Sequence, residues 1–209
     1  MSIMSGASFP GTHKVMIFID GNYLVKNISE KTDGAINYDA LARYLNTHAR
    51  FDNHIGPIMI RAYYYDGKPD VRDAENLDEK KQEAKEKIEN TLKIQDDELT
   101  KIRNTDLFDV RLGHAVITRN LEFRQKGVDL LLGIDMISKA YEGQYDVAVL
   151  VAGDSDFIEL VQAVKHIGPR VIGAYFDHNV RKELTDSFDK RFELSVENLV
   201  ANKIIEKKK

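Results

Sequence analysis

Two short, almost continuously apolar segments constrain the fold of this 209-residue chain more than any other feature. They are Val15–Ile19 and Val147–Ala152. Strands that are apolar on both faces are typical of parallel sheets covered by helices on each side, whereas half-exposed strands alternate between apolar and polar residues. The two segments therefore predict a buried parallel sheet.

Further strands and helices are predicted in alternation along the chain. Three more segments have strand composition, and a fourth reads as a strand or hairpin return: Ile58–Tyr65, Phe108–Gly113, Arg170–Tyr175 and Ala115–Arg119. Segments with helical spacing lie between the strands: Tyr38–Arg50, Val128–Tyr141 and Phe157–Ile167. This order predicts a doubly wound, three-layer α/β/α sandwich with a central, mainly parallel sheet.

One charged stretch interrupts this alternation. From Asp70 to Leu112 there is neither glycine nor proline, and apolar residues recur at helical spacings. We predict an inserted helical segment at about 70–104, with one narrow apolar stripe. The stripe faces either the domain, which is the favoured interpretation, or a partner such as a second copy of the chain. A single domain is expected at 14–200, between a flexible tail (1–13) and a basic tail (201–209).

The composition excludes several classes of protein. There is no cysteine, so disulfides, thiolate metal sites and cysteine nucleophiles are excluded, and a cytoplasmic location is expected. Since the longest apolar run is Val147–Ala152, far short of the ~20 residues of a membrane-spanning helix, no membrane association is expected. The net charge of −4 argues against binding of nucleic acid by bulk charge, so such a substrate would have to be held locally.

Aspartates follow both buried strands directly. Asp20 follows the first strand, and Asp154 and Asp156 follow the other. The carboxyl ends of parallel strands form the edge at which ligands bind, so these carboxylates are expected to meet at one crevice.

Small and neutral residues accompany these aspartates. We expect Gly21 and Gly153 to let the backbone turn sharply after each strand. Asn22 and Ser155 offer neutral oxygens beside the charges and are predicted to contact the substrate.

The predicted helix Val128–Tyr141 contributes two more aspartates. Asp129 lies in its first turn, where capping alone would account for a carboxylate. Asp135 lies inside the apolar run Leu130–Ile137, where an unpaired charge costs several kcal/mol. Six residues turn a helix by about 240°, so the two do not share a face. We interpret one as a direct ligand and the other as orienting a neighbour.

Several carboxylates in one crevice repel one another unless a cation holds them. Oxygen ligands without cysteine or adjacent histidine suit Mg²⁺ or Mn²⁺. Such a metal would polarise a phosphoryl group and lower the pKa of a bound water, which predicts phosphate chemistry. The expected metal ligands are Asp20, Asp135, Asp154 and Asp156. Three cations are predicted to steer a phosphate backbone: Arg119, Arg124 and Lys126.

Three motifs together resemble the NYN domain, in the LabA-like branch of the PIN-like nucleases. They are Ile19-Asp-Gly-Asn-Tyr23, Lys126-Gly-Val-Asp129 with Asp135, and Val151-Ala-Gly-Asp-Ser-Asp-Phe157. The resemblance implies a PIN-like fold, acidic residues around Mg²⁺ or Mn²⁺, and endoribonuclease activity on RNA. It assigns the catalytic acids to Asp20, Asp129, Asp135, Asp154 and Asp156.

Two other functions remain open on sequence alone. Gly153–Asp156 has a superficial likeness to the metal motif of haloacid-dehalogenase-like phosphatases, but Asn22 stands where their nucleophile pattern has a second acid. The other is a non-catalytic module that binds RNA or a protein and keeps a structural metal site. The tyrosines of Tyr63–Tyr65 are interpreted as core residues in preference to base-stacking ones, with Tyr64 pointing away from its neighbours.

Overall fold

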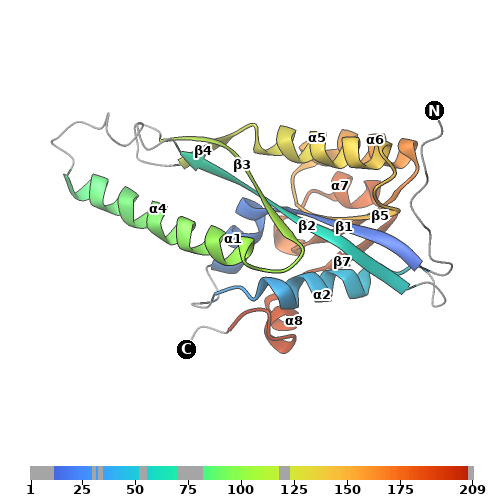
Figure 1. Cartoon of the computed structure of the whole chain (residues 1–209), viewed down its shortest axis with the longest axis horizontal. Helices are drawn as coiled ribbons and strands as arrows, with labels where there is room; N and C mark the ends of the chain where they lie inside the picture. Colours follow the sequence, from blue (N-terminus) through green and yellow to red (C-terminus); the bar gives the residue numbers. More distant parts are fainter. Residues whose placement is uncertain are drawn as a thin grey trace.

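Strands alternate with helices along the chain, as Figure 1 shows. The computed structural model describes residues 12–29, 32, 35–51, 56–69, 82–117 and 123–206. The strands are β1 (Thr12–Asp20), β2 (Gly56–Pro69), β3 (Phe108–Ile117), β4 (Phe123–Lys126), β5 (Val147–Val151), β6 (Arg170–Tyr175) and β7 (Lys190–Glu193). The helices are α1 (Gly21–Ser29), α2 (Tyr38–His48), α4 (Gln82–Arg103), α5 (Val128–Tyr141), α6 (Ile158–Ile167), α7 (Lys182–Ser187) and α8 (Val196–Ala201), with short 3-10 turns at Ser155–Phe157 and Asp177–Asn179. Within this described part, no helix is both long and apolar enough to cross a membrane.

All the strands belong to one sheet in the order β4-β3-β2-β1-β5-β6-β7. Neighbouring strands are parallel, except that β4 runs antiparallel to β3. The chain builds the sheet outward from β1 in one direction through β2 and β3, and in the other direction through β5, β6 and β7. The order of the strands therefore reverses between β1 and β5, and a crevice for ligands forms at such a switch point.

Successive residues of β1 enter two separate hydrophobic cores. Val15 and Ile17 pack on the face covered by α2 and α8, whereas Met16 and Phe18 pack on the face covered by α5, α6 and α7. Since alternate side chains of a strand point to opposite faces, a strand between two helical layers must be apolar throughout. The continuous apolar pattern of β1 and β5 is the sequence signature of this arrangement.

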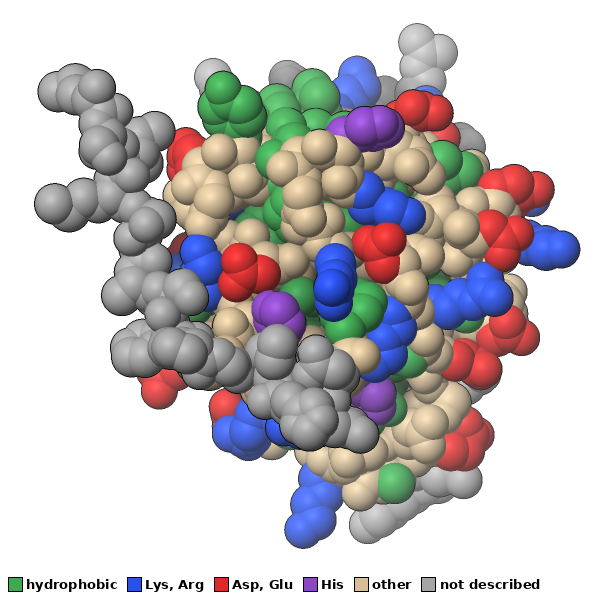
Figure 2. All heavy atoms as spheres, turned by 90° about the vertical axis from the view of Figure 1, so that its right-hand side faces the viewer, with side chains coloured by type: hydrophobic (Ala, Val, Ile, Leu, Met, Phe, Trp, Pro, Cys, Tyr) green, Lys and Arg blue, Asp and Glu red, His purple; other side chains and the backbone are tan. Residues whose placement is uncertain are grey.

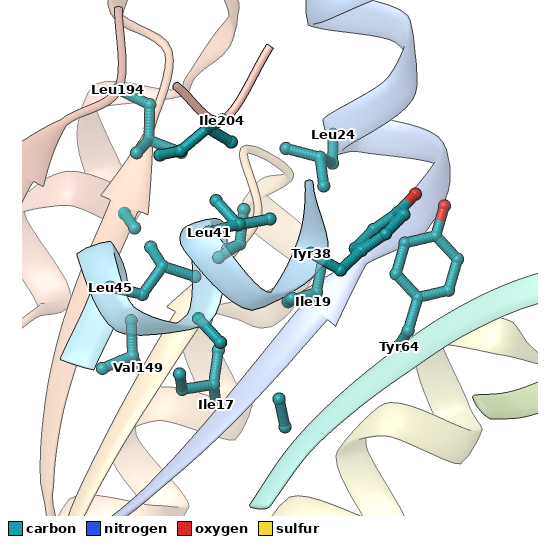
Figure 3. Packing of buried hydrophobic residues seen from close by; sticks show 14 of the residues in the cluster. Ile17, Ile19, Leu24, Tyr38, Leu41, Leu45, Tyr64, Val149, Leu194 and Ile204 are labelled. Atoms are coloured by element: carbon teal, nitrogen blue, oxygen red, sulfur yellow. The ribbon is translucent and has the colours of Figure 1, made fainter. Parts of the chain in front are cut away.

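Figure 3 shows how α2 closes one of these cores. Leu41 and Leu45 of α2 and Ile17 of β1 belong to one buried cluster, which Ile204 joins from near the end of the chain. Ile204 is fully buried, and its carbonyl oxygen accepts a hydrogen bond from the Asn37 N–H at 2.8 Å. The core therefore extends beyond the predicted boundary at residue 200.

Several element boundaries differ from the sequence-based expectation. Thr12 and His13, expected in a loose tail, begin β1. The segment Phe123–Lys126, for which no strand was predicted, is β4, which pairs with β3 from His114 to Ile117. Short polar strands at a sheet edge lack the apolar pattern on which the prediction relied. Residues 1–11, 70–81, 118–122 and 207–209 lie outside the described residues, and with them Arg119.

The charged insertion is helical where it is described. Its helix α4 buries Ile88, Leu99 and Ile102, so the apolar stripe faces the domain as favoured. The tyrosines of β2 also follow the prediction, because Tyr64 belongs to one core, and Tyr63 and Tyr65 to the other.

Candidate active site

Asp20 is the last residue of β1 and caps the helix that follows. Its Oδ1 accepts a hydrogen bond from the Tyr23 N–H at 3.0 Å, which satisfies a backbone donor in the first turn of α1. The hydroxyl of Tyr23 accepts a hydrogen bond from the Phe176 N–H at 2.9 Å, at the end of β6. Asp20 is thus held at the carboxyl edge of the sheet by a helix that is itself tied to a distant strand.

The two motif glycines are required for space. Neither Gly21 nor Gly153 has a positive φ, so the chain turns after β1 and β5 without the left-handed conformation that glycine permits. A Cβ at Gly21 would lie 2.4 Å from the ring of Tyr64, and one at Gly153 would lie 2.3 Å from the carbonyl oxygen of Asn179. Both glycines therefore let neighbouring elements approach the edge that carries the aspartates.

We expect Gly21→Ala to lower the free energy of unfolding by about 1–3 kcal/mol, because overpacking at a crowded site displaces the Tyr64 ring. Gly56→Ala is the matched control, since a Cβ at Gly56 meets nothing within 4 Å. Urea unfolding of both variants measures the difference. Equal stability of the two variants would contradict the assigned role of Gly21.

Asp154 follows β5 and begins the turn that leads into α6. Its Oδ1 accepts a hydrogen bond from the Asp156 N–H at 3.1 Å, which places the carboxylate at the N-terminal cap of a 3-10 turn. Ser155 and Asp156 belong to that turn. The loop therefore presents Asp154 at the same edge as Asp20, on the other side of the switch point.

A cleft of about 640 Å³ opens at this edge. Five acidic side chains line it, together with one basic side chain among the described residues: Asp20, Asp66, Glu98, Asp129 and Asp154, and Arg124. The edge where β1 and β2 begin, which faces the viewer in Figure 2, carries charges of both signs interspersed. In the part of the chain that the structure describes, the lining of the cleft is therefore mainly acidic.

Asp66 is a cleft residue that sequence reasoning missed. It follows the tyrosines of β2, and its carboxylate accepts hydrogen bonds from Gln95 Nε2 at 2.8 Å and Gln125 Nε2 at 2.6 Å. Its Oδ1 also accepts the Gly67 N–H at 2.7 Å. Asp66 thus joins β2 to α4 and β4. An aspartate before glycine at a strand end, as at Asp20, was the signal that could have found it.

Burial in the cleft raises the pKa of Asp20 and of Asp129. Burial raises the pKa of Asp20 to about 6, and the charges of Asp129 and Asp66 add to the effect, against the opposing hydrogen bond from the Tyr23 N–H. Partial burial raises the pKa of Asp129, and the charges of Asp154 and Asp156 raise it further. These groups therefore interact across the cleft, which connects β1, α5 and the loop after β5.

Asp135 is not among the cleft residues that the structure describes. Its carboxylate accepts hydrogen bonds from Arg111 Nε at 2.8 Å and from the Tyr65 hydroxyl at 3.1 Å, and Lys139 Nζ lies 3.6 Å away. The Asp135 side chain is almost completely buried, on the face of α5 that packs against the sheet. The charge inside the apolar run is thus compensated by ion pairing, and of the two helix acids Asp129 is the one that reaches the cleft.

Of the other residues predicted to belong to the site, some line the cleft and some do not. Asn22 and Arg124 line the cleft. Ser155, Asp156 and Lys126 lie on elements that border it, but they are outside the lining within the described part of the chain.

The donor set fits a hard divalent cation in its chemistry. All the acidic groups offer oxygen, and their mutual repulsion favours a cation that draws them together. As the described side chains are placed, however, no three acidic or histidine groups lie close enough to hold one ion. The described acidic groups therefore offer the oxygen ligands that such a cation prefers. Their side chains would have to move closer together to coordinate one ion.

The fold and the site together define a class: a three-layer α/β protein whose carboxylates gather at the switch point of a mainly parallel sheet. Within that class the chain belongs to the NYN domain family, whose model matches residues 14–195. This family is a group of PIN-like nucleases. The resemblance inferred from the three motifs is thereby confirmed.

A solved structure shares the fold. It is the crystal structure of a protein of unknown function from Vibrio parahaemolyticus, with 17% sequence identity and a TM-score of 0.62. The similarity covers 91% of this chain and 98% of that chain. At this identity the likeness concerns the fold alone, which is a PIN-like sandwich. No curated protein sequence matches the chain.

Proposed function

We propose that this protein is a metal-dependent endoribonuclease that hydrolyses phosphodiester bonds in RNA, with Mg²⁺ or Mn²⁺ as cofactor. The observation that carries the proposal is the cleft at the switch point, where burial and neighbouring carboxylates raise the pKa of Asp20 and of Asp129 in a chain of the NYN family. A cluster with perturbed pKa values in a cleft is typical of a functional site.

The residues take different roles in this proposal. Asp20, Asp129 and Asp154 would hold the metal, and Asp66, fixed by two glutamine amides, would complete the acidic wall. A bound divalent cation supplies polarisation of the phosphoryl group and a more acidic water. Arg124 would hold the phosphate backbone, because it is the cation that lines the cleft in the described part of the chain.

A second candidate function is supported by one observation. Because the described acidic side chains are not gathered around a common point, the chain could instead be an RNA-binding module without turnover. The two functions differ in one measurable property, which is cleavage in the presence of a divalent ion.

The test is an assay with a 5′-labelled RNA and the purified full chain. We expect cleavage with Mg²⁺ or Mn²⁺ and none with EDTA, whereas a contaminating metal-independent ribonuclease would remain active in EDTA. RNA binding without cleavage under either ion would favour the second candidate. Absence of both binding and cleavage would contradict both.

A further inference from the structure

Part of the cleft wall is apolar although it is exposed. Ile94 of α4 and Val25 of α1 both line the cleft, and their side chains are 71% and 39% exposed. Single exposed apolar residues are common on protein surfaces. These two, however, come from different helices and border the same acidic cleft, which indicates a surface that a ligand covers.

The position of Ile94 is fixed by its neighbours on α4. Gln95 Nε2 donates hydrogen bonds to Asp66 and to the carbonyl oxygen of Gly67 at 2.9 Å. Asp96 forms an ion pair with Lys68 Nζ at 2.6 Å. The turn of α4 that carries Ile94 is therefore anchored to the carboxyl end of β2. Its exposed apolar side chain is therefore held beside the carboxylates.

From this arrangement we propose that Ile94 and Val25 form a subsite for an unpaired nucleobase of the RNA strand. The inference rests on the proposed function, since it places the base next to the phosphate held at the carboxylates. A nucleotide combines an anionic phosphate with flat apolar base faces. The cleft offers Arg124 and the carboxylates proposed to hold the metal for the phosphate, and the aliphatic side chains of Ile94 and Val25 for the base. The cleft volume of about 640 Å³ lies within the range of about 300–1,000 Å³ that is usual for small-ligand sites.

The base must be unpaired for a steric reason. In a duplex, both faces of each base are covered by the neighbouring base pairs, so a side chain of the protein reaches only the edges. Unstacked bases of single strands expose their faces and pack on protein side chains. The subsite therefore selects single-stranded segments, loops or ends.

Binding measurements test this subsite without relying on cleavage. The probes are a fluorescent single-stranded RNA and the same strand with abasic nucleotides. Fluorescence anisotropy measures the affinity of the protein for each strand, with Ca²⁺ in place of Mg²⁺. We expect Ile94→Ala to weaken binding of the normal strand about three- to tenfold and to leave the abasic strand unchanged. Ile94→Phe should restore binding, because an aromatic ring also packs on a base.

Ile58→Ala is the matched control, because Ile58 is 43% exposed and lies near the start of β2, at the opposite edge of the sheet. It should bind both strands like the wild type. Equal affinity of Ile94→Ala and wild type for the normal strand would overturn the subsite, as would an equal loss on the abasic strand. If the base-dependent loss is found and no divalent ion supports cleavage, the subsite stands and the proposed hydrolysis fails. If RNA is cleaved and Ile94→Ala has no effect on binding, only the subsite fails.

Discussion

Asp20→Asn is expected to reduce RNA cleavage by more than about 100-fold and, in metal-free protein at neutral pH, to raise the stability of the fold. The activity is lost because the amide is a poor ligand for a hard cation. The stability rises because the wild-type carboxylate is buried beside other negative groups. Asparagine keeps the hydrogen bond, since its Oδ1 can accept from the Tyr23 N–H as the carboxylate does.

The stability difference depends on pH with a definite sign. The pKa of Asp20 rises from 3.8 in the unfolded chain to about 6 in the fold. As the pH rises through this interval, the unfolded chain releases its proton and the folded protein retains it, so the wild type loses stability. Above about pH 6 the loss is complete, and the variant should be more stable by roughly 1–3 kcal/mol.

Urea unfolding in EDTA between pH 4 and pH 7.5 measures this effect. The advantage of Asp20→Asn should shrink as the pH is lowered toward 4, and Mg²⁺ should stabilise the wild type more than the variant. Asp106→Asn serves as the control, because Asp106 is exposed in the turn between α4 and β3. A variant less stable than the wild type at pH 7.5 would show that Asp20 holds the fold together and is not strained by its surroundings.

The buried ion pair under α5 leads to the second large effect. Arg111→Met is expected to lower the free energy of unfolding by about 2–3 kcal/mol, because among the described residues it would leave the Asp135 carboxylate with Lys139 at 3.6 Å and Tyr65 as partners. The Arg111 side chain is 44% exposed, so water offsets part of the loss. Adding Asp135→Asn to Arg111→Met should recover most of the stability, since the uncompensated charge is then removed.

The control for this prediction is a solvent-exposed ion pair between an arginine and an aspartate. Arg61 and Asp109 form an ion pair at 3.1 Å with both side chains more than 40% exposed. Arg61→Met should therefore cost less than about 1 kcal/mol. Thermal unfolding of the three variants decides the point. If Arg111→Met and Arg61→Met melt at the same temperature, burial of Asp135 contributes nothing to the pair.

Local sequence patterns predicted the three-layer α/β/α architecture and two of the acidic residues of the cleft. The unbroken apolar runs of β1 and β5 imply burial on both faces, and an aspartate directly after such a strand must lie at its carboxyl edge. Two of the predicted acids, Asp20 and Asp154, line one cleft for this reason. The position of each aspartate directly after a strand was sufficient to predict where it lies, because the direction of the strand decides at which edge of the sheet the residue is found.

The residues that sequence reasoning misplaced depend on contacts between distant elements. Asp135 finds Arg111 only because β3 lies under α5, and nothing in either segment indicates that pairing. Likewise, Asp66 joins the cleft through amides from α4 and β4, two elements that flank β3 in the chain. Side-chain partners that cross from one element to another are set by tertiary packing, which a single sequence does not display.

The contact between Tyr23 and Phe176 has a consequence for synthesis on the ribosome. The helix after Asp20 is secured by an N–H that lies 153 positions later in the chain, and Gly153 packs against the same tyrosine ring. A nascent chain that stops before β6 lacks this anchor and the strand beside β5. The acidic edge is thus completed only when about four-fifths of the polypeptide has been synthesised, so folding of this edge depends on contacts that are distant in the sequence.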